Sequence, residues 1–411
     1  MAHPIVHADM NSSSVTHASV RPDRSERRLR QGSAWVMLYF LLQAELGLAW
    51  DRQWHDLVGR DQFWIPPHIL MYSGLGGAGL VALWMVLADT VRYLRRVPGV
   101  DDSSTFGVLG VFHAPLGFIM LGFGALTDLA AAPLDNYWHE LYGIDVTLWS
   151  PFHIMGTIGG ILAGLGAIYA FASEAALERQ TEHPSRHFLG LNGPEWGTLI
   201  LLSAFMELPL PALTAFSPIA FGSLNLLTYP LILACAGGFA LIAAVRFTGK
   251  PGTATLTALL LWLEAVITQS FVPWTLLYTV PRFGLTFRFT GREPAFNVTL
   301  ALLPLLFLTG ASLIDGVALW QRQHRKTLSS GLRGAWSLGI LIALPAAVLP
   351  SWIVLVLMHL PPVFSLPPDV LKVLAPHWLD TLLTFPLTLI IGTITAMVGA
   401  SLGDIWHWNR R

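Results

Sequence analysis

Two short segments of the chain carry the same pattern of groups that can bind a metal, an aspartate followed by two histidines. The six residues are Asp51, His55, His68, Asp135, His139 and His153. In each copy the first histidine follows the aspartate by four residues, so both side chains project from one face of a helix. The second histidine follows a proline, Pro66 or Pro151, which suits the first turn of the next helix. Each segment therefore predicts a carboxylate and two imidazoles that converge from two helices, as in a catalytic metal site with open positions.

The two segments resemble each other beyond these ligands. Residues 51–69 and 135–154 share Asp, Trp-His, Gly, Asp, Trp, Pro and His-Ile in the same order, with one residue inserted in the second. Both lie between an outgoing and an incoming apolar block, which predicts a duplicated helical hairpin. The shared acids Asp61 and Asp145 suit hydrogen bonding to a ligand imidazole, with salt bridging or helix capping as an equal alternative. The tryptophans of the motifs fit an interfacial aromatic belt, and they are Trp54, Trp64, Trp138 and Trp149.

A histidine that anchors a helix at the membrane surface by hydrogen bonding is the simpler interpretation of any single motif residue. An ionisable group inside a membrane costs about 2.5–3.5 kcal/mol on insertion scales, so such groups gather around partners or a metal. Four histidines in two copies of one frame favour the metal site. The chain has a single cysteine, Cys235, in an apolar block, so the metal must be held by nitrogen and oxygen.

Composition indicates the class of protein that must position these motifs. Of the 411 residues, 54% are hydrophobic and 12% are charged, and the mean hydropathy is +0.57. A soluble globule needs more polar surface than this. The apolar residues form blocks of about 18 to 25, the length that crosses a hydrocarbon core of roughly 30 Å. The net charge of -1 leaves no basic surface for nucleic acid, so the expected surrounding is the lipid bilayer.

The sequence predicts an all-α polytopic membrane protein with ten transmembrane helices, among them the two tandem hairpins. The predicted spans are 34–50, 69–91, 107–131, 153–174, 195–214, 219–245, 254–279, 295–319, 335–358 and 381–403. Nine or eleven spans are the alternatives, because Pro209, Pro211 and Pro218 can mark a re-entrant segment. The chain is predicted to divide into three regions. They are a disordered cytoplasmic tail at 1–31, a two-hairpin metal-site region at 32–190 and a six-helix region of unknown role at 191–411.

The basic residues indicate the orientation. Most of the 24 Lys and Arg residues fall in the N-terminal tail, in the C-terminal Arg410 and Arg411, and in alternate loops between the spans. The positive-inside rule then places both termini in the cytoplasm and both Asp–His–His motifs near the outer face. The expected location is the inner membrane of a bacterium.

The first motif resembles the metal-binding signature of one membrane-embedded subunit of the copper membrane monooxygenases, the family of particulate methane and ammonia monooxygenases. The residues in register are Asp51, Trp54, His55, Arg60, Asp61, Pro66, His68 and Ile69. The resemblance implies that Asp51, His55 and His68 bind copper. It covers only about residues 34–175, and the spans after residue 190 match no pattern of the family.

A second motif of that family, Asn-x3-His-x13-His, matches the spacing of Asp135, His139 and His153. In the family, its asparagine and first histidine join the last histidine of the earlier motif around a second copper position. The resemblance thus implies that His68 lies near Asp135 and His139. Asp135 replaces the asparagine, and its added negative charge favours a harder or more oxidised cation.

The expected function is that of a membrane protein that binds copper, or another transition metal held by nitrogen and oxygen, and oxidises a small hydrophobic substrate with dioxygen. Companion monooxygenase-type subunits or an electron donor are the implied partners. A metal transporter or metal-handling membrane protein is the first alternative, and a haem-type electron-transfer protein of the membrane is the second. The intramembrane acids Glu45 and Asp128 suit a proton relay or pairing with neighbouring helices. Residues 195–411 are expected to support the site by packing or by gating lipid access, with His359 and His377 in a loop.

Overall fold

The computed structural model describes residues 24–59, 63–97, 105–142, 150–180, 187–209, 219–222, 224–289, 291, 293–324, 339–346 and 378–407. The helices are α1 (Arg24–Leu57), α2 (Pro66–Leu94), α3 (Leu116–Tyr142), α4 (Pro151–Arg179), α5 (Gly193–Glu207), α7 (Tyr229–Thr248), α8 (Thr253–Arg282), α9 (Val298–Leu302), the 3-10 helix η2 (Leu303–Leu306), α10 (Phe307–Gln323) and α13 (Trp378–His407). Two antiparallel hairpins pair β1 (Thr105–Val108) with β2 (Phe112–Pro115) and β3 (Ile219–Phe221) with β4 (Leu224–Leu226).

Eight helices in the described part of the chain are long and apolar enough to cross a membrane. Large apolar side chains such as Leu80, Trp84 and Leu126 are exposed on the outside of the bundle, as expected for a surface that faces lipid. Buried positions along α3, α4 and α7 are mostly alanine and glycine, which let the helices approach closely. These features confirm the prediction of an all-α integral membrane protein.

The third predicted span, 107–131, is wrong at its start. Residues 105–115 form the β1–β2 hairpin, and α3 begins only at Leu116. Leu109 and Gly110 have φ of 55° and 70°, a left-handed turn that a right-handed helix cannot contain. The apolar composition of this stretch suggested a helix, but the local turn conformation ends the helical pattern.

The fifth predicted span, 195–214, is also longer than the helix that forms. α5 ends at Glu207 after 15 residues. Its start is set by a capping box, in which the Asn192 side chain accepts from the backbone N of Glu195 at 2.8 Å and the Glu195 side chain accepts from the backbone N of Asn192 at 3.0 Å. α5 is therefore shorter than the length that crosses a membrane.

Two other predicted spans meet the structure only in part. The β3–β4 hairpin occupies the first turns of span 219–245, and α7 begins at Tyr229. Span 335–358 lies outside the described residues except for a helical stretch at 339–346. The count of ten spans stays a prediction beside the eight membrane-length helices of the described residues.

The first helix begins earlier than expected. Residues 24–31, predicted as part of a disordered tail, form the first turns of α1, whereas residues 1–23 lie outside the described part. Arg30 is only 2% exposed, and it pairs with Glu26 at 2.6 Å and with Asp89 of α2 at 3.3 Å. A buried guanidinium needs these carboxylates, so the pairs fix the start of α1 against α2.

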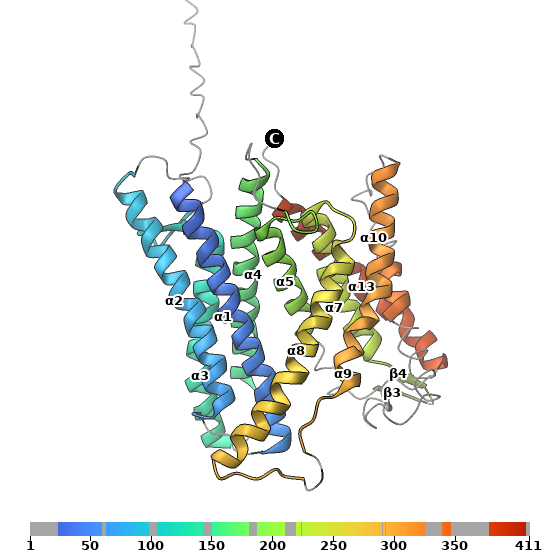
Figure 1. The fold of residues 1–411 in the computed structure, drawn as a ribbon. Helices are drawn as coiled ribbons and strands as arrows, with labels where there is room; N and C mark the ends of the chain where they lie inside the picture. The colour runs from blue at the N-terminus through green and yellow to red at the C-terminus, as the bar shows by residue number, and fades with distance from the viewer. Residues whose placement is uncertain are drawn as a thin grey trace, which may run out of the picture.

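α1 packs on α2 and α3 packs on α4 as two helical hairpins that lie side by side (Figure 1). A Cβ on Gly47 would lie 2.6 Å from the backbone N of Met71, and a Cβ on Gly124 would overlap the backbone of Ala163. Glycine is required at both crossings because the backbones touch. Both hairpins turn at the same end of the molecule, so the two Asp–His–His motifs lie at that end (Figure 1).

The opposite end is held by polar contacts among helix ends. Arg179, the last residue of α4, donates to the backbone O of His407 at the end of α13 at 2.8 Å and lies 3.5 Å from Glu195. Arg27 of α1 lies 3.9 Å from Glu174 of α4 at the same end. The first described helix therefore begins where the last one ends (Figure 1).

The contact between α3 and α4 gives a test of the fold. Gly124→Ala places a methyl group against the Ala163 backbone and should destabilise the protein by about 1–3 kcal/mol, the usual cost of overpacking. Gly122→Ala, on the same helix, meets only Ala82 Cβ at 3.9 Å and should leave stability nearly unchanged. Thermal unfolding in detergent measures both. Equal melting temperatures for the two variants would contradict the close crossing.

Candidate metal centres

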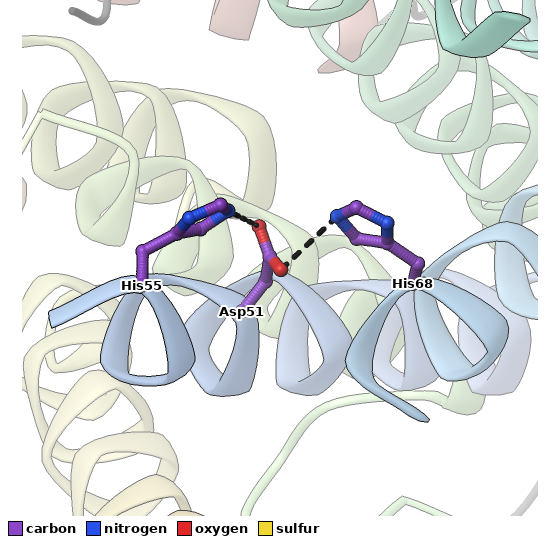
Figure 2. A group of neighbouring side chains, drawn as sticks. All are labelled: Asp51, His55 and His68. Carbon is purple, nitrogen blue, oxygen red and sulfur yellow. Dashed lines mark ion pairs between the residues drawn. The ribbon is translucent and has the colours of Figure 1, made fainter. Parts of the chain in front are cut away.

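The first motif comes together as the sequence predicts (Figure 2). Asp51 and His55 project from the end of α1, and His68 projects from the start of α2. The Asp51 carboxylate lies between the two rings, with Oδ1 3.1 Å from Nε2 of His68 and Oδ2 3.5 Å from Nε2 of His55. One ligand atom from each residue lies within 4.8 Å of the other two. Ligands held at about 2.0–2.2 Å around one ion are roughly 3–4 Å apart, so small rotamer adjustments would close the set around a metal.

The backbone determines which nitrogen of His68 faces Asp51. Nδ1 of the ring lies 3.2 Å from the carbonyl O of Phe63, which can only accept, so Nδ1 carries a proton and donates. In the neutral ring Nε2 is then an acceptor, and it faces a carboxylate oxygen at 3.1 Å. Two acceptors at this distance need a positive charge between them, either a second ring proton or a metal ion. The donor set thus fits a metal that takes the place of that proton, with the Phe63 carbonyl orienting the ligand.

The second half of the chain covers the first motif. The backbone N of Arg288, beyond the end of α8, donates to the O of Leu57 at 2.7 Å, and its guanidinium donates to the backbone O of His55 at 3.4 Å. Gly59, with φ of 72°, makes room for this guanidinium, because a Cβ there would lie 2.5 Å from Arg288 Cδ. Trp54, predicted in the interfacial belt, is instead fully buried among apolar residues of α1 and α8. Its large ring fills the helix contact behind the motif, so the interfacial interpretation is wrong for this residue.

The second motif forms a similar group with a different carboxylate geometry. Asp135 and His139 lie near the end of α3, and His153 lies in the first turn of α4. Nε2 of His139 and Nε2 of His153 both lie 3.2 Å from the same oxygen, Oδ2 of Asp135. Ser150, the N-cap of α4, donates to Oδ1 of Asp135 at 3.4 Å and accepts from the backbone N of His153 at 3.1 Å. Ser150 therefore positions both the carboxylate and the second histidine.

Sequence reasoning missed Ser150 because the first motif has Ile65, which makes no side-chain cap, at the corresponding position. A serine directly before Pro151 is a recognisable helix N-cap, and that signal could have identified it. The carboxylate of the second motif is thus held by a neighbouring hydroxyl, whereas the ring of the first motif is held by a backbone carbonyl.

All six predicted ligands come together, as two separate groups of three. His68 groups with the residues of its own motif. The approach of His68 to Asp135 and His139 that the resemblance implies is not found, since no ligand group of the described residues mixes the two motifs. Four other residues of the prediction lie outside the described residues, and they are Asp61, Asp145, His359 and His377.

The two deeper acids take other positions. Glu45 groups with Glu207 and Glu264, from α1, α5 and α8, and belongs to neither motif. Asp128 is 9% exposed and packs on α4, where its Oδ1 lies 3.3 Å from the Cβ position of Gly156. Its Oδ2 is enclosed and has no hydrogen-bond partner among the described residues. Asp128 likewise belongs to neither ligand group.

Comparison of the chain with models of protein families, with curated proteins and with solved structures finds no match. The chemistry of the two motifs is therefore inferred from their donor atoms, distances and surroundings. A carboxylate and two imidazoles at these separations can hold one transition-metal ion and leave positions open for other ligands.

The more exposed and the more buried histidines of the motifs should differ in how readily they react. The side chain of His153 is 36% exposed and that of His68 only 11%. Diethyl pyrocarbonate should therefore modify His153 several-fold faster than His68 in metal-free protein in detergent, as followed by mass spectrometry of peptides. His324, exposed at the end of α10, gives the reference rate. Equal rates for His153 and His68 would show that the ring of His68 is not enclosed.

Proposed function

We propose that this chain is a copper-binding membrane protein of the monooxygenase type, which oxidises a small hydrophobic substrate with dioxygen. The two Asp–His–His groups are the proposed copper ligands. The observation that carries the proposal is the 3.1 Å approach of His68 Nε2 to Asp51 Oδ1, while the other nitrogen of that ring faces the Phe63 carbonyl. A metal ion that replaces the proton between these two acceptors would satisfy both, and imidazole with carboxylate suits copper.

When bound, copper would supply the oxygen and electron chemistry. The residues of the chain hold the ion and shape its surroundings. Asp51 brings the negative charge and faces both imidazoles, and the Phe63 carbonyl turns Nε2 of His68 toward Asp51. Arg288 donates to the backbone O of His55 and so holds the end of α1 that carries two of the ligands. In the second motif Ser150 holds the carboxylate in place.

The position of the motifs suits a substrate that arrives through lipid. Helix ends beside them carry exposed apolar side chains, among them Ile69, Leu134, Leu141 and Ile154. A small hydrophobic molecule concentrates in the hydrocarbon and can reach the motifs from the side of the bundle. In each motif the more buried histidine, His68 or His139, suits a reaction kept from bulk water, and the more exposed one, His55 or His153, suits exchange with an electron donor or a companion protein.

The haem alternative is disfavoured by the place of the carboxylate. The rings of His55 and His68 are 6.5 Å apart between centroids, and Asp51 lies between them, where the iron of a doubly histidine-ligated haem would have to be (Figure 2). In the second motif the aspartate takes the same place, because Asp135 contacts both histidines. An aspartate in that position has a role in a metal site and none in haem ligation.

A metal transporter is the second candidate, and one observation favours it. Glu45, Glu207 and Glu264 form a group deeper in the bundle than Asp51, as a path for cations would need. The charge of Arg52 acts on Glu207 and Glu45, which counts against a passing cation. Copper uptake by vesicles that contain the purified protein distinguishes the two functions.

Metal analysis and activity test the proposal together. Wild-type protein should bind one copper ion at each motif, whereas His55→Ala and His139→Ala should each lose one and the double variant both. The control His324→Ala, at the far end of α10, should bind as wild type. In native membranes with a reductant, wild-type protein should transfer isotopically labelled oxygen to a short hydrocarbon, and His55→Ala should reduce this at least tenfold.

A double variant that retains all its copper would overturn the metal sites. Unlabelled product in wild-type membranes, together with copper uptake into vesicles, would favour the transporter. Copper binding should also weaken as the pH falls, because imidazole and carboxylate must lose their protons to bind.

The orientation is part of the proposal. The start of α1 and the end of α13 lie at one end of the bundle, and the motifs lie at the other (Figure 1). With the basic segments inside, the first end is cytoplasmic and the motifs face the outer side of a bacterial inner membrane.

Reporter fusions check this orientation. Alkaline phosphatase, which is active only outside the cytoplasm, should be active when fused after Gly59, beside the first motif, and inactive when fused after Arg411. A fusion after Arg21, ahead of the first helix, serves as the matched inactive control. Activity after Arg411 with none after Gly59 would reverse the assignment.

A further inference from the structure

Three half-buried glutamates meet where α1, α5 and α8 pack together, away from both motifs. Glu45 lies in α1, Glu207 is the last residue of α5, and Glu264 lies midway along α8. One carboxylate oxygen of each lies within 4.8 Å of the other two. Glu45 and Asp51 are six residues apart, about 9 Å along the helix axis at 1.5 Å per residue, and they point to different faces of α1. The group is therefore distinct from the first motif.

The carboxylates of the group can hydrogen-bond to one another only if a proton is bound. One carboxylate oxygen of Glu45 lies within 4.8 Å of one from Glu207 and one from Glu264. Ionised carboxylates have only acceptors, so a hydrogen bond between any two of them forms only when one is protonated. Ser203 donates its hydroxyl to Oε1 of Glu264 at 2.8 Å, and the second oxygens of Glu207 and Glu264 are enclosed with no partner among the described residues.

The charges around the group also favour bound protons. Arg52, seven residues after Glu45 and so on the same face of α1, is a cation close enough to act on Glu207 and Glu45, and it also acts on Asp51 and Asp56. Its Nε is enclosed and has no hydrogen-bond partner in the described part of the chain. Three ionised carboxylates would leave two negative charges unbalanced by one guanidinium in a membrane interior, which is costly. Glu207 also lies at the negative end of the α5 dipole, which disfavours its ionisation further.

We propose that Glu45, Glu207 and Glu264 form an intramembrane proton-binding site that holds shared protons at neutral pH. Arg52 balances one carboxylate, and protons neutralise the others. A metal ion is disfavoured, because the guanidinium repels it and because the group has no nitrogen ligand among the described residues. The protons let α1 pack against α5 and α8, and so join the helix that carries the first motif to the second half of the chain.

Infrared spectroscopy of the full-length protein in lipid nanodiscs tests the site. Wild-type protein at neutral pH should show the carbonyl band of protonated carboxylic acids, which shifts in heavy water and disappears as the pH is raised. Glu207→Gln should lower the intensity of the band, and Glu45→Gln with Glu207→Gln should lower it further. Glu293→Gln, at an exposed loop glutamate, is the matched control and should leave the band unchanged.

Asp128→Asn identifies the contribution of an enclosed acid outside the group and should leave the glutamate band in place. A wild-type spectrum without the band, or a band that the glutamate variants leave unchanged, would overturn the proposal. Loss of a bound metal ion in Glu207→Gln would overturn it in favour of a cation site. These outcomes are independent of copper at the histidine motifs, which the glutamate variants should retain in full.

Discussion

An ionisable side chain inside a membrane has no water to solvate it, so its partner must come from the protein. The polar contacts of this structure follow from that constraint. At one end Arg30 is buried between Glu26 and Asp89, and this pairing joins α1 to α2. At the other end Asp51 lies between two imidazoles, and in the interior three glutamates surround the proposed protons. Ionisable groups that cannot face lipid therefore hold these helices against one another.

These partners can meet only where the helices approach closely. Each Asp–His–His motif takes its ligands from both arms of a hairpin, so the separation of the arms decides whether the donors converge. Gly47 and Gly74 bring α1 against α2, and Gly124 and Gly159 bring α3 against α4, with no space for a Cβ at any of the four. Packing of small residues is therefore a condition for the proposed metal sites as well as for the stability of the bundle.

Features that lie within one hairpin can be predicted from the sequence. Contacts between helices that are distant in the sequence cannot. The six ligands follow from the four-residue spacing on a helix and from the proline at the start of the next one, both of which are local. The membrane class follows from composition. The start of α3 was predicted wrongly because apolar composition cannot distinguish the strands before Leu116 from a helix. The glutamate group was missed because its three members meet only through the packing of α1, α5 and α8, and Ser150 because it has no counterpart in the first motif.

The central claim is that each motif binds a transition metal through its own aspartate and histidines. Pulsed electron paramagnetic resonance of protein loaded with Cu(II) tests this most directly, because it detects the nitrogen nuclei of coordinated imidazole. Wild-type protein should show coupling to two histidine rings at each site. His68→Ala should lose one ring at the first motif, and the spectrum of the second motif should stay unchanged. A spectrum with oxygen ligands alone, or one that His68→Ala and His153→Ala leave unaltered, would contradict the claim.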